Sequence, residues 1–227
     1  EDHDNLRSMP GSYKKIQKSY NVISPLRAKY PNLVLDCNSV FTSSSEIYLL
    51  SALKTINKDF KFDNMSVTYA RGVIKDNSLK NVSKNRYVEI NKFLEEREKN
   101  KEKRFLYPLW RGVNSVSREN LMRTVFDEEF VTSCVAGRKL LVVSETGEVQ
   151  PCEILGKSIG NLRNHDWDLK KLLKENEVNK MQKWIKDTKC KCSFECALAA
   201  NVVWKPKNYP KVLSSAVKNM GKSYIKY

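Results

Sequence analysis

The sequence contains no long apolar run and very little histidine. None of its hydrophobic segments approaches the roughly 18 residues that a membrane-spanning helix requires, so we do not expect a membrane protein. No charged and then apolar leader opens the chain, and we therefore expect a cytoplasmic protein. Histidine occurs only as His3 and His165, so a metal site would use other ligands. Internal repeats and low-complexity linkers are also missing.

The charge of the chain is strongly basic. Its 227 residues include 41 Lys and Arg against 26 Asp and Glu, a net charge of +15, with 41% hydrophobic residues. This composition is typical of a globular protein of one large or two small domains. Clustered basic residues would suit nucleic acid, but those of Lys80 to Arg104 are interleaved with glutamates, as on a solvated helix face. We therefore do not expect a nucleic-acid partner, and only the tail 205–227, with six lysines and no acid, stays unexplained.

The first half of the sequence alternates between helical and extended patterns. Apolar spacing and turn residues predict a helix, a strand, a serine-capped helix, a strand and a charged helix, at Ser12–Ala28, Asn32–Thr42, Glu46–Asn57, Asn64–Ala70 and Ser83–Arg104. This order predicts βαβ units and a parallel sheet, which is an α/β fold. So few strands cannot close a barrel. Since the chain begins at Glu1 rather than Met, we expect further strands upstream of it.

The second half has a different pattern. A helix is predicted over Ser115–Phe130 and another over Asp166–Lys186. Between them, Leu140–Ser144 and Glu148–Gln150 flank the turn residues Thr146 and Gly147, which predicts a β-hairpin.

Five of the six cysteines fall in this second half. Cys37 stands alone in a predicted strand, where a small buried hydrophobic residue is the simplest interpretation. The other five form two groups, one at the ends of the hairpin and one in a C-x-C-x3-C loop: Cys134 and Cys152, then Cys190, Cys192 and Cys196. An odd number fits disulfide pairing poorly. An all-sulfur site for zinc or for an iron–sulfur cluster is favoured, and the spacing leaves both open.

The motifs around these cysteines resemble a known domain. Cys134-Val-Ala-Gly, then Gly147-x4-Cys152 within a G-x-V-x-P-C-E pattern, and the later Ile159-Gly-Asn-Leu resemble the SPASM/twitch domain of radical SAM enzymes. The resemblance implies one auxiliary iron–sulfur cluster, usually 4Fe-4S. By position its ligands would be Cys134, Cys152 and Cys196, with Cys190 or Cys192 as the fourth.

The first half is similar to the same family, although more weakly. The segments His3-Asp4-x2-Arg7 and Tyr69-Ala-Arg71-Gly are similar to those after the fourth strand and at the end of the sixth strand of its barrel. The resemblance implies an α/β fold of three parts. These are the C-terminal half of a partial (β/α)6 radical SAM barrel (1–112), a small α+β SPASM/twitch domain with a β-hairpin (113–204), and a basic C-terminal tail (205–227). Arg7 and Arg71 would be cofactor-binding residues, with ordinary ion pairing or packing as the alternative for each.

The family's C-x3-C-x2-C loop does not occur in this sequence. The chain therefore looks like a fragment and by itself lacks the residues that would cleave S-adenosylmethionine. For the intact protein the resemblance implies a second 4Fe-4S cluster, cleavage of S-adenosylmethionine to a 5′-deoxyadenosyl radical, and an electron donor such as ferredoxin or flavodoxin. The substrate class would be a peptide or protein. Two alternatives stay open, a zinc-stabilised nucleic-acid-binding module and a non-catalytic iron–sulfur scaffold.

Overall fold

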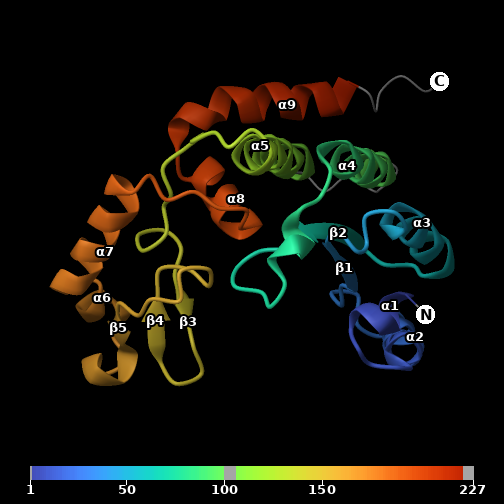
Figure 1. Cartoon of the computed structure of the whole chain (residues 1–227), viewed down its shortest axis with the longest axis horizontal. Coiled ribbons are helices and arrows are strands. Elements are labelled where there is room, and N and C mark those ends of the chain that lie inside the picture. Colours follow the sequence, from blue (N-terminus) through green and yellow to red (C-terminus); the bar gives the residue numbers. More distant parts are fainter. Residues whose placement is uncertain (1, 100–105, 222–227) are drawn as a thin grey trace. The chain divides into compact units, whose positions relative to one another are not determined.

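The computed structural model describes residues 2–99 and 106–221 and contains both helices and small sheets (Figure 1). Its contacts divide the chain into two compact units. The first comprises residues 1–68 and 78–98, and the second comprises residues 69–77 and 99–227. The predicted domain boundary at residues 112 and 113 lies inside a helix, Tyr107–Val125, which belongs to the second unit.

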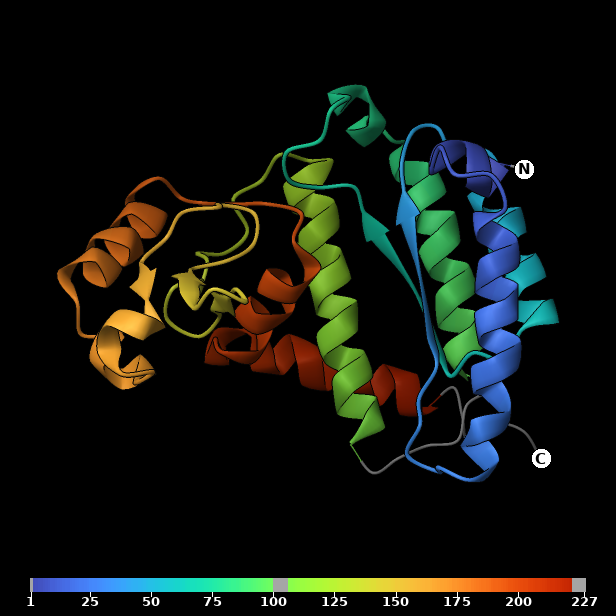
Figure 2. The same cartoon turned by 90° about the horizontal axis from the view of Figure 1, so that it is seen from below.

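The first unit is a βαβ arrangement with additional helices. It contains, in chain order, α1 (Asp2–Leu6), α2 (Ser12–Ile23), a 3-10 turn (Ser24–Ala28), β1 (Asp36–Phe41), α3 (Leu49–Asp59), β2 (Asn64–Tyr69), a 3-10 turn (Asn77–Lys80) and α4 (Lys84–Lys99). Strands β1 and β2 form a two-stranded sheet. The arrows of both strands point the same way in Figure 2. The predicted parallel βαβ unit is therefore confirmed.

The two faces of this sheet differ in polarity. On one face of β2, Met65, Val67 and Tyr69 are buried, as the two-residue period of a strand requires. On the other face, a row of polar side chains links the strands through the bonds Asn64 Nδ2 to Asp36 Oδ1 (2.7 Å) and Ser66 Oγ to Asn38 Oδ1 (3.0 Å). Helices α2, α3 and α4 lie on one side of the sheet (Figures 1 and 2).

The serines that were predicted to cap the second helix do something else. Helix α3 begins at Leu49, and no side chain caps its N-terminus at Tyr48. The Ser45 hydroxyl instead donates to the Thr42 carbonyl (3.1 Å) and accepts from the Thr42 N–H (3.0 Å). The prediction was wrong because a serine hydroxyl can bond a neighbouring turn as readily as a helix end.

Asp4 caps the next helix across a turn. Its carboxylate accepts the Gly11 N–H (2.6 Å), the Ser12 hydroxyl (2.7 Å) and the Tyr13 N–H (2.8 Å) at the start of α2. Gly11, the N-cap residue of α2, has φ +77°. Because glycine has no side chain that could cap the helix, the carboxylate of Asp4 caps it instead. These hydrogen bonds hold the pKa of Asp4 well below its usual range.

We expect Asp4→Asn to lower the melting temperature of the full chain at neutral pH. Because the folded pKa of Asp4 is depressed, its stabilisation is present above the unfolded pKa of about 3.9 and is lost as the pH falls toward the folded value. The difference between variant and wild type should therefore shrink in acid. Melting curves at pH 7 and at several acidic pH values check this, with the exposed Asp187→Asn as control. A difference that is constant with pH would contradict the assignment.

The second unit combines one small antiparallel sheet with five α-helices among the residues described. These elements are α5 (Tyr107–Val125), β3 (Val142–Val143), β4 (Glu148–Gln150), β5 (Gly160–Asn161), α6 (Leu169–Leu172), α7 (Asn176–Asp187), α8 (Glu195–Val203) and α9 (Tyr209–Gly221), with 3-10 turns at Leu162–His165 and Pro206–Asn208. The sheet order is β3-β4-β5, with Val142 opposite Gln150 and Glu148 opposite Asn161. The predicted hairpin is confirmed, and β5 is an addition to it.

Two helix predictions in this unit had wrong bounds. Helix α5 begins at Tyr107, eight positions before the predicted start, with Pro108 in its first turn, where proline is tolerated. The predicted helix Asp166–Lys186 is two helices. Asp166 and Trp167 have positive φ, and the Asp168 carboxylate then caps α6 by accepting from the N–H groups of Lys170 and Lys171.

Helix α5 is the support on which α8 and α9 pack. Val116, Val202 and Val212 form a buried apolar cluster, one from each helix. Gly112 of α5 lies against the backbone of α9, where an added Cβ would be 2.5 Å from the Val212 carbonyl oxygen. None of the helices that the structure describes has both the length and the apolar character needed to cross a membrane.

Candidate functional site

Four of the five second-half cysteines gather in one apolar cluster of the second unit. Cys134 and Cys152 are buried in it, together with Ile185 and Phe194. Cys190 and Cys192 are partly buried and pack against the same cluster. Cys134, Cys190 and Cys192 also line a small pocket with Thr132 and Asn201 among its other lining residues.

The first pair of cysteines is positioned by turns at the two ends of the hairpin. The Cys134 sulfur accepts the Ala136 N–H (3.4 Å). The adjoining Val135 N–H donates to Asn201 Oδ1 of α8 (2.8 Å), a bond between buried groups that anchors this loop. Cys152 follows β4 directly after the buried Pro151.

The second pair of cysteines lies in the loop between α7 and α8. The Cys190 N–H donates to the Ile185 carbonyl (3.0 Å), so this cysteine is held at the end of α7. The Cys192 sulfur accepts the Phe194 N–H (3.4 Å), immediately before α8 begins at Glu195. Cys196, in the first turn of α8, is exposed. Thus the loop turns two of its three thiols into the cluster.

The electrostatics of the site disfavour free thiolates. Burial raises the pKa of Cys134 and Cys190, and it raises the pKa of Cys192 to about 11. Repulsion from the neighbouring thiols adds to the increase for all three. Without a cation these thiols therefore stay protonated at neutral pH, whereas a bound metal favours the thiolate form.

In kind and number these thiols fit an all-sulfur metal site. Four cysteine ligands are what structural zinc and 4Fe-4S clusters take. Backbone N–H groups on the sulfurs of Cys134 and Cys192 are the type of hydrogen bond that orients and tunes such ligands. Among residues 2–99 and 106–221, no three His, Cys, Asp or Glu side chains already form a group that could hold a metal ion. The donors are thus gathered but not arranged as a coordination shell.

The two motifs that border Cys152 pair with each other in the sheet. Gly147, at φ +83°, makes the hairpin turn, and its carbonyl accepts the Leu162 N–H (2.8 Å). Val149 of β4 lies opposite Gly160 of β5 and is fully buried. Two motifs that are separate in the sequence thus form one support for Cys152.

Arg71 belongs to the second unit, which contains the cysteine cluster, whereas Arg7 belongs to the first unit. The Arg71 guanidinium forms ion pairs with Glu153 and Glu195. Glu153 follows Cys152 in the sequence, and Glu195 precedes Cys196. Burial raises the pKa of Glu195, while the Tyr69 N–H and Arg71 oppose that increase. Arg7 is exposed after α1 in the first unit, and its side chain has no partner within the described part of the chain. A cofactor-binding role stays a prediction for both arginines.

Comparisons with known proteins give one structural similarity. No protein-family model matches the sequence, and no curated protein matches it. Among solved structures, a chain described as polyhistidine-tagged anSMEcpe with bound AdoMet is similar, at 18% sequence identity and a TM-score of 0.47. The match covers 95% of this chain and 60% of that chain, so this chain spans about three fifths of its length.

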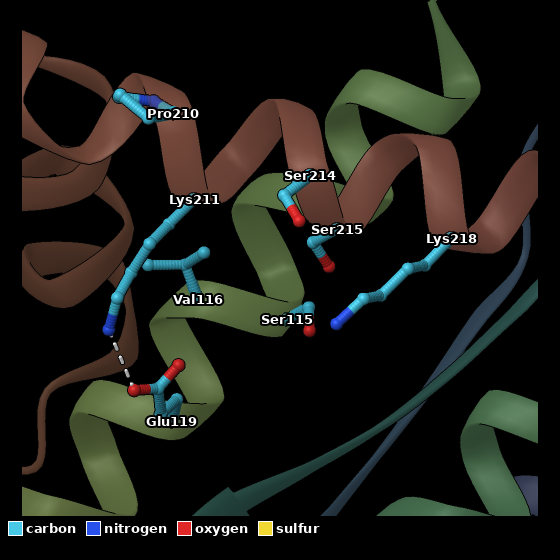
Figure 3. A pocket seen from close by; sticks show the side chains of 8 residues that line it. All are labelled: Ser115, Val116, Glu119, Pro210, Lys211, Ser214, Ser215 and Lys218. Carbon is cyan, nitrogen blue, oxygen red and sulfur yellow. Dashed lines mark hydrogen bonds and ion pairs between the residues drawn. The ribbon is translucent and has the colours of Figure 1, made fainter.

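Three lysines in the described part of the basic tail lie in different surroundings. Lys205 reaches back to the loop before Cys134, where its ammonium group donates to Thr132 Oγ1 (2.8 Å) and to Ser133 Oγ (2.6 Å). Burial lowers the pKa of Lys205 to about 8. Lys211 pairs with Glu119 of α5 (2.9 Å), and these two residues and Lys218 line one pocket between α5 and α9 (Figure 3). The described part of the tail is therefore a 3-10 turn followed by α9, which packs on α5.

Two supporting residues were missed by the sequence analysis. Asn201 and Lys205 both hold the loop that carries Cys134. The sequence does single out Asn201, because it is the one amide in the otherwise apolar stretch Ala197–Val203 of α8. A polar side chain on a buried helix face usually has a specific partner. Lys205 carried no comparable signal, since it stands among many exposed lysines.

Proposed function

We propose that this chain binds one auxiliary iron–sulfur cluster through Cys134, Cys152, Cys190 and Cys192. The observation that carries the proposal is the gathering of these four thiols in one buried cluster of the second unit. The G-x-V-x-P-C-E and I-G-N-L motifs support the iron–sulfur interpretation over zinc, because they match the SPASM/twitch pattern and form one paired support for Cys152.

The roles of the chain's own residues follow from their positions. The four thiols would be the ligands, and the N–H groups of Ala136 and Phe194 would hold two of the sulfurs and tune the potential of the site. When bound, the cluster supplies one-electron transfer or a contact for the substrate. The buried side chains of Ile185 and Phe194 would limit access of water.

For the whole protein we propose a radical SAM enzyme of the SPASM/twitch type. In it, the first unit would be the later part of a partial (β/α)6 barrel. Binding and cleavage of S-adenosylmethionine would require a C-x3-C-x2-C loop that is not in this sequence. A peptide or protein substrate and a ferredoxin or flavodoxin donor belong to the same proposal. The scaffold alternative differs from it only in lacking that loop in the full-length protein. No observation in the described residues favours the nucleic-acid alternative.

The proposal is tested by the metal content of the chain. Protein that is purified and reconstituted without oxygen is expected to be brown and to hold about four iron and four acid-labile sulfide per chain. Cys152→Ala, which removes one proposed ligand, serves as the matched control and should hold far less of both. Colourless protein with about one zinc per chain would overturn the iron–sulfur proposal.

A further inference from the structure

We propose that Arg71 is a positioning residue for the cysteine site. One guanidinium holds Glu153, which follows Cys152, and Glu195, which lies three residues after Cys192, onto the segment after β2. The inference rests on the proposed function, because it concerns the ligands of the same site.

The contacts of Arg71 use all three of its side-chain nitrogens. Nε and Nη2 donate to Glu153 Oε1 at 3.1 and 2.9 Å, and Nη1 donates to Glu195 Oε2 at 2.6 Å. The second oxygen of Glu195 accepts the Tyr69 N–H at 2.8 Å. Charge-assisted bonds of this kind are stronger than neutral ones, and the rigid fork of arginine fixes both carboxylates in direction as well as in distance.

Arg71 also contacts the ring that supports Cys192. Its guanidinium carbon lies 4.7 Å from the centre of the Phe194 ring, which is almost fully buried in the cysteine cluster. The N–H of the same Phe194 donates to the Cys192 sulfur. Arg71 therefore touches both cysteine-bearing segments directly, and it reaches the sulfur of one proposed ligand through a single residue.

Of the two ion pairs of Arg71, the pair with Glu195 is the more enclosed, because the Glu153 side chain is 48% exposed. The side chain of Arg71 is 23% exposed and that of Glu195 is 28% exposed. Ile154 packs beside the following Gly72, where an added Cβ would lie 3.7 Å from its Cδ1. Loss of the guanidinium would leave the carboxylates of Glu153 and Glu195 near each other without a cation, and both segments would be free to shift.

The test compares the full-length chains Arg71→Lys and Arg71→Ala with Arg123→Lys after reconstitution. Arg123 is a matched control, because it also pairs with two glutamates, Glu119 and Glu129, in the same unit. Both Arg71 variants are expected to lose iron to a chelator about 10- to 100-fold faster than wild type. They should also change the electron paramagnetic resonance spectrum of the reduced protein, with Arg71→Lys nearer to wild type. Arg123→Lys should change neither property.

Failure of this inference can be distinguished from failure of the proposed function. If wild type holds iron while both Arg71 variants keep its rate of iron loss and its spectrum, the positioning role is overturned and the iron–sulfur proposal stands. If wild type takes up no iron, the proposed function fails and the positioning role with it. A double-mutant cycle of Arg71→Ala and Glu195→Gln, measured by urea unfolding of the metal-free chains, tests the Arg71–Glu195 ion pair alone. Additive effects on the free energy of unfolding would show that this ion pair does not hold the two segments together.

Discussion

Replacing Cys192 with alanine is expected to remove most of the bound iron and sulfide, whereas replacing Cys196 is expected to leave both in place. The reason is the way the loop before α8 presents its thiols. Cys192 packs against the cluster that contains Cys134 and Cys152 and accepts a backbone hydrogen bond, while Cys196 is exposed on the first turn of α8. Each thiolate contributes a large share of the binding free energy of a four-ligand site. Iron and sulfide analysis of the reconstituted variants, with their visible spectra, is the measurement.

The control for this pair is Cys37→Ala. Cys37 is a half-buried thiol of β1 in the first unit, so its loss removes a cysteine without touching the site. It should bind as much iron as wild type. If Cys196→Ala loses the iron and Cys192→Ala keeps it, the ligand set that we infer from the packing is wrong. The assignment by sequence position, with Cys196 as a ligand, would then hold.

Gly112→Ala is expected to destabilise the second unit by about 2 kcal/mol. Two effects oppose each other at this position. Alanine is favoured over glycine inside a helix by about 1 kcal/mol. The added Cβ, however, would lie 2.5 Å from the backbone oxygen of Val212, which cannot rotate away as a side chain would. Helix α9 must therefore move away from α5, and the packing of Val116, Val202 and Val212 loosens.

Urea unfolding of the full chain checks this prediction, with Ser115→Ala as the matched control. Ser115 lies on the same helix and lines the pocket between α5 and α9, so alanine there gains helix propensity without a clash (Figure 3). Its stability should be unchanged or slightly higher. A Gly112→Ala variant at least as stable as wild type would show that α9 does not pack closely on α5 in solution.

Local sequence pattern was sufficient to predict elements with clear apolar alternation or with a turn glycine. The strand Asn64–Tyr69 alternates cleanly between apolar and polar residues, and Gly147 supplies the positive φ of the hairpin turn. The start of α5 could not be predicted, because Gly112 weakens a helical pattern unless another backbone is known to pack against it. Strand β5 has only two residues and forms because β4 offers it an edge.

The candidate site likewise has features that the sequence predicts and features that only the packing decides. Spacing and motif predicted one all-sulfur site among the five second-half cysteines, since the cysteines and the turn glycines are visible in the sequence. Which thiols face inward depends on how the loop after α7 turns before α8 begins. The choice between Cys192 and Cys196 therefore required the packing of Phe194 and the start of the helix.

The sequence by itself determined that this chain is a basic, histidine-poor α/β protein, and it predicted that a metal site would use sulfur ligands. These properties depend only on which residues are present and how they are spaced. The tertiary structure alone decided which four thiols gather, that Asn201 and Lys205 hold the Cys134 loop, and that Arg71 binds Glu153 and Glu195. The residues joined by these hydrogen bonds and ion pairs are 66 to 124 positions apart in the sequence. Contacts over such separations depend on how distant segments pack, and no local pattern encodes that.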